Sequence, residues 1–245
     1  NNNRLEPLWE IDFPHSLGLL YSSFTYYCGF KVNSGEYKLM GLAPYGEPVY
    51  KDLILQHLIE VKDDGSFHLN MKYFNYTTGL TMTSKYFDQL FGSAARQAET
   101  EISQREMDLA CSIQQVTEEI LLKMVNHIHK TTQNDYLCLA GGVALNCVAN
   151  GELLRKSPFK DIWIQPAAGD AGGAIGCALA LWHQHYKQDI KIKDNVNDLM
   201  QGSFLGPEYN HSQITSYLDS ISAPYHFYKD SKLYPLLAKY LDQGN

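Results

Sequence analysis

Two glycine-rich segments contain the residues of this chain best suited to bind a phosphate. The first is LAGGVALN at 139–146, and the second is QPAAGDAGGA at 165–174. Each follows an apolar run typical of a strand and opens an apolar run typical of a helix. Exposed N–H groups and the positive end of a helix dipole both favour phosphate oxygens. The pair therefore predicts a nucleotide site, although Gly141 and Gly142 taken alone are also typical of a simple tight turn.

Four polar side chains in or near glycine-rich turns are candidates for ligand contacts. The amide of Asn146 can donate and accept, which suits a nucleobase or ribose edge, or else it faces solvent from within a helix. Asp170 is suited to bind a metal ion or to face a phosphate. Alternatively, it caps a helix, an interaction that stabilises a protein by about 1 kcal/mol. Lys38 can reach a phosphate as a point charge, or else it forms a solvated surface with Glu36.

An alternating order of helices and strands positions the two turns. A long helix over 103–130 is predicted by its apolar spacing and by a capping box of Ser103 and Glu106. Because strands joined by a helix are typically parallel, we expect an α/β layer with both turns at the carboxyl ends of its strands. The elements expected after the long helix are a strand at 136–140, a helix at 143–154, a strand at 161–165 and a helix at 171–186.

Other segments predict a helical region before this layer and a separate unit after it. A helix is expected within 13–30, a short helical piece at 35–46, and a hairpin around the Asp-Gly turn between 59–62 and 66–70. Residues 189–201 are polar and typical of a connector, whereas 233–241 have a helical apolar pattern that stops abruptly. Both ends of the chain indicate a fragment of a longer protein.

Composition limits the classes of partner. The chain has 245 residues, 44% of them hydrophobic, and a net charge of -7. A negative charge argues against nonspecific binding to nucleic acid, and no apolar run is long enough to span a membrane. The five cysteines form no C-x-x-C pair, which favours buried, reduced thiols in a cytoplasmic protein.

Four motifs in order resemble the O-carbamoyltransferases of the nodulation-protein-U type. They are FPHSLGLLY at 13–21, KLMGLAPYG at 38–46, LAGGVALN at 139–146 and QPAAGDAG at 165–172. The resemblance implies an α/β actin-like ATPase fold, related to ribonuclease H, with a mixed sheet and flanking helices. It divides the chain into part of the carbamoyltransferase domain at 1–188, a connector at 189–203, and the beginning of a YrdC-like domain at 204–245.

The same resemblance implies a reaction. ATP and carbamoyl phosphate would form a carbamoyl adenylate in the YrdC-like domain. The carbamoyl group would then pass to a hydroxyl of a small molecule in the actin-like domain, at iron or another divalent metal. Asp170 resembles the carboxylate that binds the metal in this family. The nucleotide-facing turn of the family is similar to Gly141, Gly142 and Asn146. By the same resemblance, Gly169 lets the backbone approach the phosphate. Glu36 and Lys38 fall in a stretch similar to one that lines the nucleotide in related tRNA-modifying enzymes.

One departure from the family pattern limits this interpretation. The family supplies two metal-binding histidines from an H-x-x-x-H segment, and this spacing does not occur in the chain. Most of a YrdC-like domain is also missing. We therefore expect the remaining metal ligands to lie outside this chain, and we expect the 245 residues alone to bind metal weakly and to be inactive.

Two other functions remain open at this level. A threonylcarbamoyl-transferring enzyme acting on tRNA shares the fold and the Gly-Gly-Val turn, although the negative charge and the segment at 38–46 favour carbamoyl transfer to a small molecule. A non-catalytic nucleotide-binding module would retain the fold without the chemistry. Binding of tRNA distinguishes the first alternative.

Overall fold

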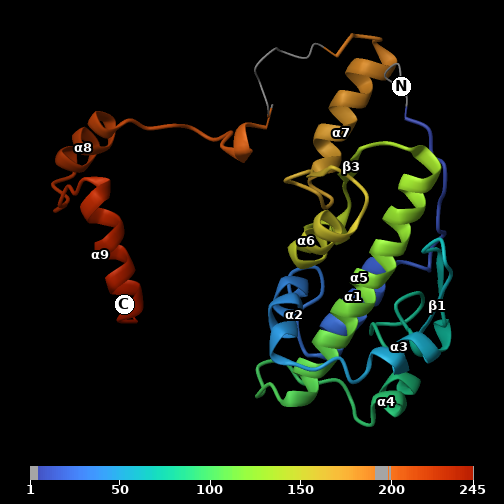
Figure 1. The fold of residues 1–245 in the computed structure, drawn as a ribbon. Helices are drawn as coiled ribbons and strands as arrows, with labels where there is room; N and C mark the ends of the chain where they lie inside the picture. The colour runs from blue at the N-terminus through green and yellow to red at the C-terminus, as the bar shows by residue number, and fades with distance from the viewer. Residues whose placement is uncertain (1–4, 191–197, 199, 245) are drawn as a thin grey trace. The chain divides into compact units, whose positions relative to one another are not determined.

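The computed structural model describes residues 5–190, 198 and 200–244, which fall into two compact units. Unit 1 covers Asn1–Lys191 and unit 2 covers Ile192–Asn245. The two units are described separately (Figure 1). Residues 191–197 and 199, which make up much of the predicted connector, lie outside the described residues.

The first half of unit 1 is mainly helical. Ser16 caps α1 by accepting a hydrogen bond from the backbone N–H of Leu19. The predicted hairpin is confirmed, because β1 and β2 pair antiparallel around the Asp-Gly turn. The elements of this half are α1 (Leu17–Tyr27), α2 (Glu36–Leu42), the 3-10 helix η1 (Ala43–Tyr45), α3 (Lys51–His57), β1 (Ile59–Val61), β2 (Phe67–Leu69), the 3-10 helix η2 (Met71–Tyr73) and α4 (Lys85–Phe91).

The long helix α5 (Gln104–Thr132) is the central element of unit 1. It contacts α1, α2, α3, η1 and the later helix α6 (Cys147–Lys156) (Figure 1). The predicted capping box of Ser103 and Glu106 is present, with a Glu106 carboxylate oxygen 2.9 Å from the backbone nitrogen of Ser103. Helix α5 thus supplies one rigid surface for both halves of the unit.

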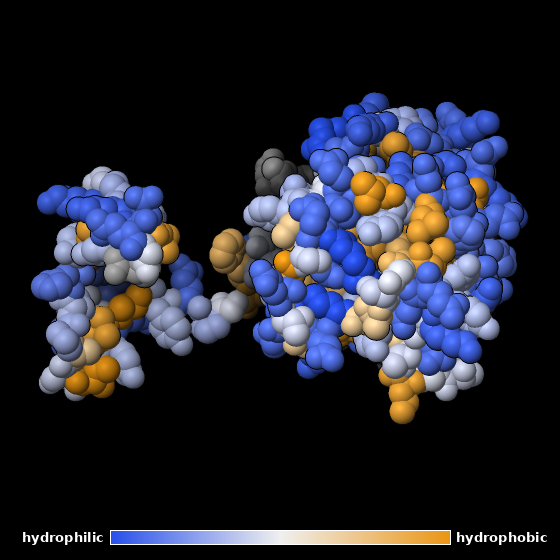
Figure 2. Space-filling model, turned by 90° about the horizontal axis from the view of Figure 1, so that it is seen from below, coloured by the Kyte–Doolittle hydropathy of each residue, from blue (hydrophilic) through white to orange (hydrophobic). Residues whose placement is uncertain are grey.

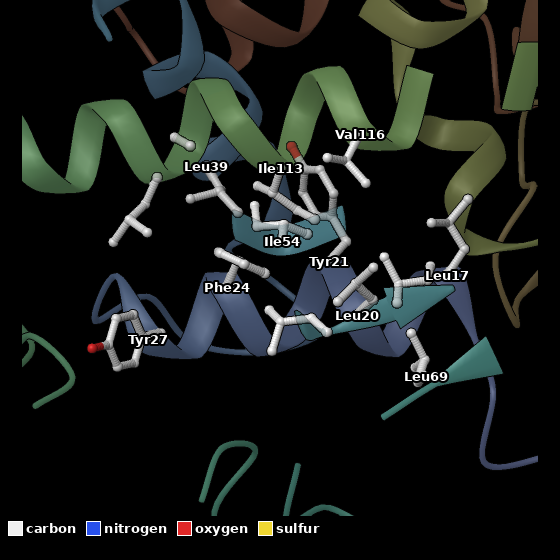
Figure 3. Close-up of a cluster of buried hydrophobic side chains, with 14 of the residues drawn as sticks. Leu17, Leu20, Tyr21, Phe24, Tyr27, Leu39, Ile54, Leu69, Ile113 and Val116 are labelled. Carbon is white, nitrogen blue, oxygen red and sulfur yellow. The ribbon is translucent and has the colours of Figure 1, made fainter. Parts of the chain in front are cut away.

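Helices α1 and α5 face each other across the main hydrophobic core (Figure 3). Leu20 and Phe24 on α1, Leu39 on α2, Ile54 on α3 and Ile113 on α5 are fully buried. Burying an aliphatic or aromatic side chain of this size contributes about 1.5–3 kcal/mol, so this core fixes α1 and α2 relative to α5.

The second half of unit 1 is the predicted α/β layer. Strands β3 (Tyr136–Leu139) and β4 (Asp161–Ile164) pair in parallel, which confirms the predicted strand direction and the α/β class. Among the described residues the strands form two separate pairs, β1–β2 and β3–β4, rather than one mixed sheet. The layer also contains the 3-10 helix η3 (Gly142–Leu145), α6, α7 (Gly172–Ala180) and the π-helix η4 (Leu181–His185).

The expectation of buried cysteines is wrong for four of the five, of which Cys111 is half-buried and three are exposed. All five thiols are free, but only Cys28 is buried, while Cys138, Cys147 and Cys177 are exposed. Cys138 lies in β3 and Cys177 in α7, a helix with no buried residue. An apolar sequence did not predict burial here because the two-stranded layer leaves these surfaces uncovered. Burial raises the pKa of Cys28 to about 12.

Unit 2 contains the short 3-10 helix η5 (Gln201–Ser203), α8 (His211–Ser220) and α9 (Asp230–Asp242). The helix predicted at 233–241 lies within α9. None of the described residues of unit 2 is buried.

Across the described residues of the whole chain, no helix is long and apolar enough to cross a membrane. Hydrophilic residues cover most of the face seen in Figure 2, with apolar residues scattered among them.

Candidate functional site

A pocket in unit 1 brings both glycine-rich turns against α1 and α2. Its volume of about 630 Å³ lies within the range typical of small-molecule sites, about 300–1,000 Å³. Five residues predicted from sequence share this pocket. They are Glu36, Gly142, Asn146, Gly169 and Asp170.

Direct backbone contacts hold the two turns together. The N–H of Gly141 donates to the carbonyl of Ala168 at 2.7 Å, and the N–H of Gln165 donates to the carbonyl of Leu139 at 3.2 Å. Gly141 has φ +99°, a conformation that favours glycine. It is not among the pocket-lining residues, so its observed role is to join the turns.

Glycine is needed in the second turn because the chain folds back closely on itself. A Cβ atom at Gly172 would lie 2.1 Å from the carbonyl oxygen of Ala167. At Gly142, by contrast, a Cβ atom would meet nothing within 4 Å, and at Gly169 it would make only an ordinary 3.9 Å contact with Leu145. Gly142 and Gly169 therefore leave open space on the pocket wall rather than relieving a clash.

Asn146 caps helix α6 and is not inside it, so the predicted helix start at residue 143 is wrong. The segment from Gly142 to Leu145 is a 3-10 helix, and α6 begins only at Cys147. The Oδ1 atom of Asn146 accepts a hydrogen bond from the N–H of Ala149 at 3.0 Å. Asparagine strongly prefers this capping position, which ends the 3-10 turn and starts the α-helix.

Asp170 lines the pocket with an exposed side chain. The cap position of α7 is taken by Ala171, without a side-chain hydrogen bond, so Asp170 does not cap this helix. Among the described residues, its carboxylate has no hydrogen-bond partner. The carboxylate is thus available for a ligand.

Glu36 and Lys38 lie on different sides of α2. An oxygen of Glu36 accepts hydrogen bonds from the Ser22 hydroxyl at 2.7 Å and from the N–H of Asn33 at 3.0 Å, and Glu36 lines the pocket. Lys38 is exposed and is not among the lining residues. Residues two apart on a helix do not face the same way, so contact of a ligand with Glu36 does not imply contact with Lys38.

Sequence reasoning missed the side of the pocket formed by α1. Tyr21 and Ser22 line it, and the hydroxyl of Tyr21 donates to Gln114 on α5 at 2.9 Å. Burial raises the pKa of Tyr21, with smaller contributions from nearby acidic groups such as Glu118, so the hydroxyl stays protonated at neutral pH. The signal in the sequence is the polar residues within the family motif at 13–21 and just after it, which predicted a helix and the family resemblance but no pocket wall.

The described residues do not form a metal centre by themselves. No group of three or more His, Cys, Asp or Glu side chains among them is arranged to hold an ion. His127 and His129, two residues apart on α5, contact different rings: His127 contacts Trp9 and His129 contacts Phe159. Within the part of the chain that the structure describes, Asp170 therefore has too few partner ligands to hold a metal ion.

Comparison with known proteins assigns the family. Residues 1–179 match the carbamoyltransferase N-terminus family, a range that includes both turns and the pocket. The chain belongs to the nodulation-protein-U type of carbamoyltransferases. The sequence resemblance is thereby confirmed for the segment that contains the pocket.

Three relatives illustrate the similarity. An uncharacterized protein, sll1178, from Synechocystis is 58% identical over 245 residues, which is 99% of this chain and 40% of that protein. Nodulation protein NolNO from Sinorhizobium fredii is 35% identical over 74% of the chain and 25% of its own length. Nodulation protein NolO from Bradyrhizobium diazoefficiens is 38% identical over 69% of the chain and 29% of its own length. The chain thus spans 40% or less of each.

Proposed function

We propose that this chain forms the nucleotide-holding part of an ATP-dependent O-carbamoyltransferase. The substrates are ATP, carbamoyl phosphate and a small molecule with a hydroxyl group, and the intermediate is a carbamoyl adenylate. The observation that carries the proposal is the meeting of both glycine-rich turns, Glu36 and Asp170 in one pocket of suitable size, within the segment that matches the carbamoyltransferase family.

In the proposed reaction the pocket binds and orients the adenylate. The acceptor oxygen attacks the carbamoyl carbon, the bond to the phosphate oxygen of AMP breaks, and the hydroxyl proton is lost to solvent or to a base. The open backbone at Gly142 and Gly169 provides space beside the phosphate, and the capped start of α6 favours its negative charge. Holding the adenylate in one orientation lowers the entropic part of the barrier.

The actin-like ATPase fold is part of this proposal. It is supported by the parallel pair β3–β4, with both glycine-rich turns at the carboxyl ends of its strands. Ligands bind at this edge in open α/β sheets. We further propose that residues 204–245 begin a YrdC-like domain and that the enzyme acts in the cytoplasm.

The metal enters the proposal only through Asp170. In the proposed enzyme Asp170 is one carboxylate ligand of iron or another divalent metal, and the other ligands come from residues outside this chain. Because the described residues do not complete such a site, we assign no step of the reaction to the metal.

The experiment compares two Asp→Asn variants of the full-length enzyme. Asp170→Asn is expected to abolish carbamoyl transfer with little effect on the unfolding temperature, because its side chain is exposed. Asp161→Asn is the matched control, since Asp161 is exposed on β4 of the same layer and does not line the pocket. Full activity of Asp170→Asn would refute the role of this carboxylate.

Two further measurements test the scope of the proposal. Titration of the 245-residue chain with ATP tests the nucleotide site of unit 1, and failure to bind would overturn it. Titration with tRNA tests the alternative of a threonylcarbamoyl-transferring enzyme, for which we expect no specific binding. Carbamoyl transfer by the 245 residues alone would show that the metal ligands expected elsewhere are unnecessary.

A further inference from the structure

A buried glutamine on α5 connects the pocket to the helical core. Gln114 is only 4% exposed, and it uses its full hydrogen-bonding capacity. Its Oε1 atom accepts from the Tyr21 hydroxyl at 2.9 Å and from Nδ2 of Asn146 at 2.9 Å. Its Nε2 atom donates to Glu118 at 2.8 Å and to Oδ1 of Asn146 at 3.1 Å.

Two partners with unambiguous chemistry fix the orientation of both amides. The backbone N–H of Ala149 can only donate, so the Asn146 atom that it faces is the oxygen Oδ1. A carboxylate oxygen of Glu118 is the acceptor on the other side, so the Gln114 atom that it faces is the nitrogen Nε2. A flip of either amide would place two donors or two acceptors against each other.

The consequence is that Asn146 can no longer accept a hydrogen bond from a ligand. Both acceptor positions of its Oδ1 are occupied, by Ala149 and by Gln114. Among the described residues, Nδ2 donates to Gln114, and this uses one of its two N–H groups. Since Asn146 lines the pocket, the second N–H is what it can offer to a ligand.

We propose that Gln114 is a positioning residue that makes Asn146 a hydrogen-bond donor, and not an acceptor, towards the pocket. The ligand group at this point is then an acceptor oxygen of the phosphate or carbamoyl part of the adenylate, and not a ribose hydroxyl acting as donor. This inference rests on the proposed nucleotide function. It deepens that function by assigning the type of ligand atom and a residue behind the pocket wall.

The physical basis is the stiffness of the connection. Gln114 projects from the packed helix α5, between residues such as Ile113 and Val116 that are fully buried. Two reciprocal bonds between the amides restrict rotation of Asn146 more than one bond would. Because a buried amide without partners is costly, the network has few alternative arrangements.

The test uses ATP titration and thermal unfolding of the 245-residue chain. Gln114→Glu replaces the Nε2 donor by an oxygen facing Oδ1 of Asn146 and the Glu118 carboxylate. We expect ATP to bind at least tenfold more weakly and the unfolding temperature to fall. The double variant Gln114→Glu with Glu118→Gln removes the repulsion between positions 114 and 118, but it does not restore the donor to Asn146. It should recover stability without recovering ATP affinity.

The matched control is Gln104→Glu. Gln104 lies on the same helix and donates to Asp108 four residues later at 2.9 Å, but it does not line the pocket. ATP affinity within twofold of the unaltered protein is expected for this control. Gln114→Met, which introduces no charge, is the second variant if the carboxylate prevents folding, and the same tenfold loss is expected.

Each outcome decides between distinct hypotheses. If the folded Gln114 variants bind ATP within twofold of the unaltered protein, the positioning role is wrong. If the double variant recovers affinity together with stability, Gln114 has only a structural role and the inference is also overturned. If the unaltered protein does not bind ATP, the proposed nucleotide function itself fails, and the ligand assignment fails with it.

Discussion

Glu36 and Asp170, the two carboxylates that line the pocket, are held very differently. Glu36 accepts hydrogen bonds from Ser22 and Asn33, which fix its position at the start of α2. The exposed carboxylate of Asp170 has no such partner among the described residues. At the scale of single residues, Glu36 is therefore suited to shape the pocket, whereas Asp170 is suited to meet a ligand directly.

Gly142 gives a second test at the residue scale. Its open side means that Gly142→Val should leave the fold intact, while the added side chain enters the space that we assign to the nucleotide. We expect at least a tenfold loss of ATP affinity by calorimetry. Gly176→Val is the control, because a Cβ atom at Gly176 also meets nothing within 4 Å and this residue does not line the pocket. Equal affinity of the two variants would count against a ligand beside Gly142.

At the scale of elements, the capping box of α5 predicts a pH dependence. Burial alone would raise the pKa of Glu106, but hydrogen bonds from Ser103 and the charge of Arg105 outweigh it and lower the pKa. The carboxylate therefore stabilises the fold above its unfolded pKa of about 4.3, and this contribution is lost as the pH falls through the lower, folded value. Glu106→Gln should reduce the free energy of unfolding near pH 7 and flatten its decline in acid.

Urea unfolding between pH 3 and pH 7 measures this effect. The control is Glu119→Gln, which changes a more exposed carboxylate of α5 that pairs with Lys51 on α3 and with Lys123 on α5. Exposed ion pairs contribute about 0–1 kcal/mol, so the pH profile of this control should stay close to that of the unaltered protein. Identical pH profiles for the two variants would contradict the role of the capping box.

The turn before α7 gives the second prediction at this scale. Gly172→Ala places a methyl group against the Ala167 carbonyl, and the backbone must move to accept it. We expect a loss of about 1–3 kcal/mol in the free energy of unfolding, together with weaker ATP binding, because Gly169 and Asp170 lie in this turn. Urea unfolding and ATP titration measure the two effects. Unchanged stability would mean that the turn is not as tight as the structure shows.

At the scale of the whole molecule, the pocket belongs to unit 1 alone. Among the residues that the structure describes, those that line the pocket lie between Ser16 and Asp170, within unit 1. A protein that ends at residue 190 should therefore bind ATP within about threefold of the unaltered chain, as measured by titration. A larger loss would show that residues of unit 2 support the site.

The sequence alone determined the elements and the family. Apolar periodicity predicted α5, the spacing of Ser103 and Glu106 predicted its capping box, and the alternation of helices and strands predicted the parallel pair. The four motifs identified the carbamoyltransferase resemblance, and two glycine-rich turns between strands and helices indicated one edge of a layer. These are properties that residue type and spacing encode directly.

Only the tertiary structure decided how the site is assembled. Asn146 proved to be a cap held by Gln114, a residue 32 positions away in the chain, and Tyr21 entered the pocket wall from α1. Glu36 faces the pocket whereas Lys38 does not, and three cysteines in apolar runs are exposed. Such contacts depend on how distant helices pack, and local sequence carries no direct record of which side chains that packing brings within hydrogen-bonding distance.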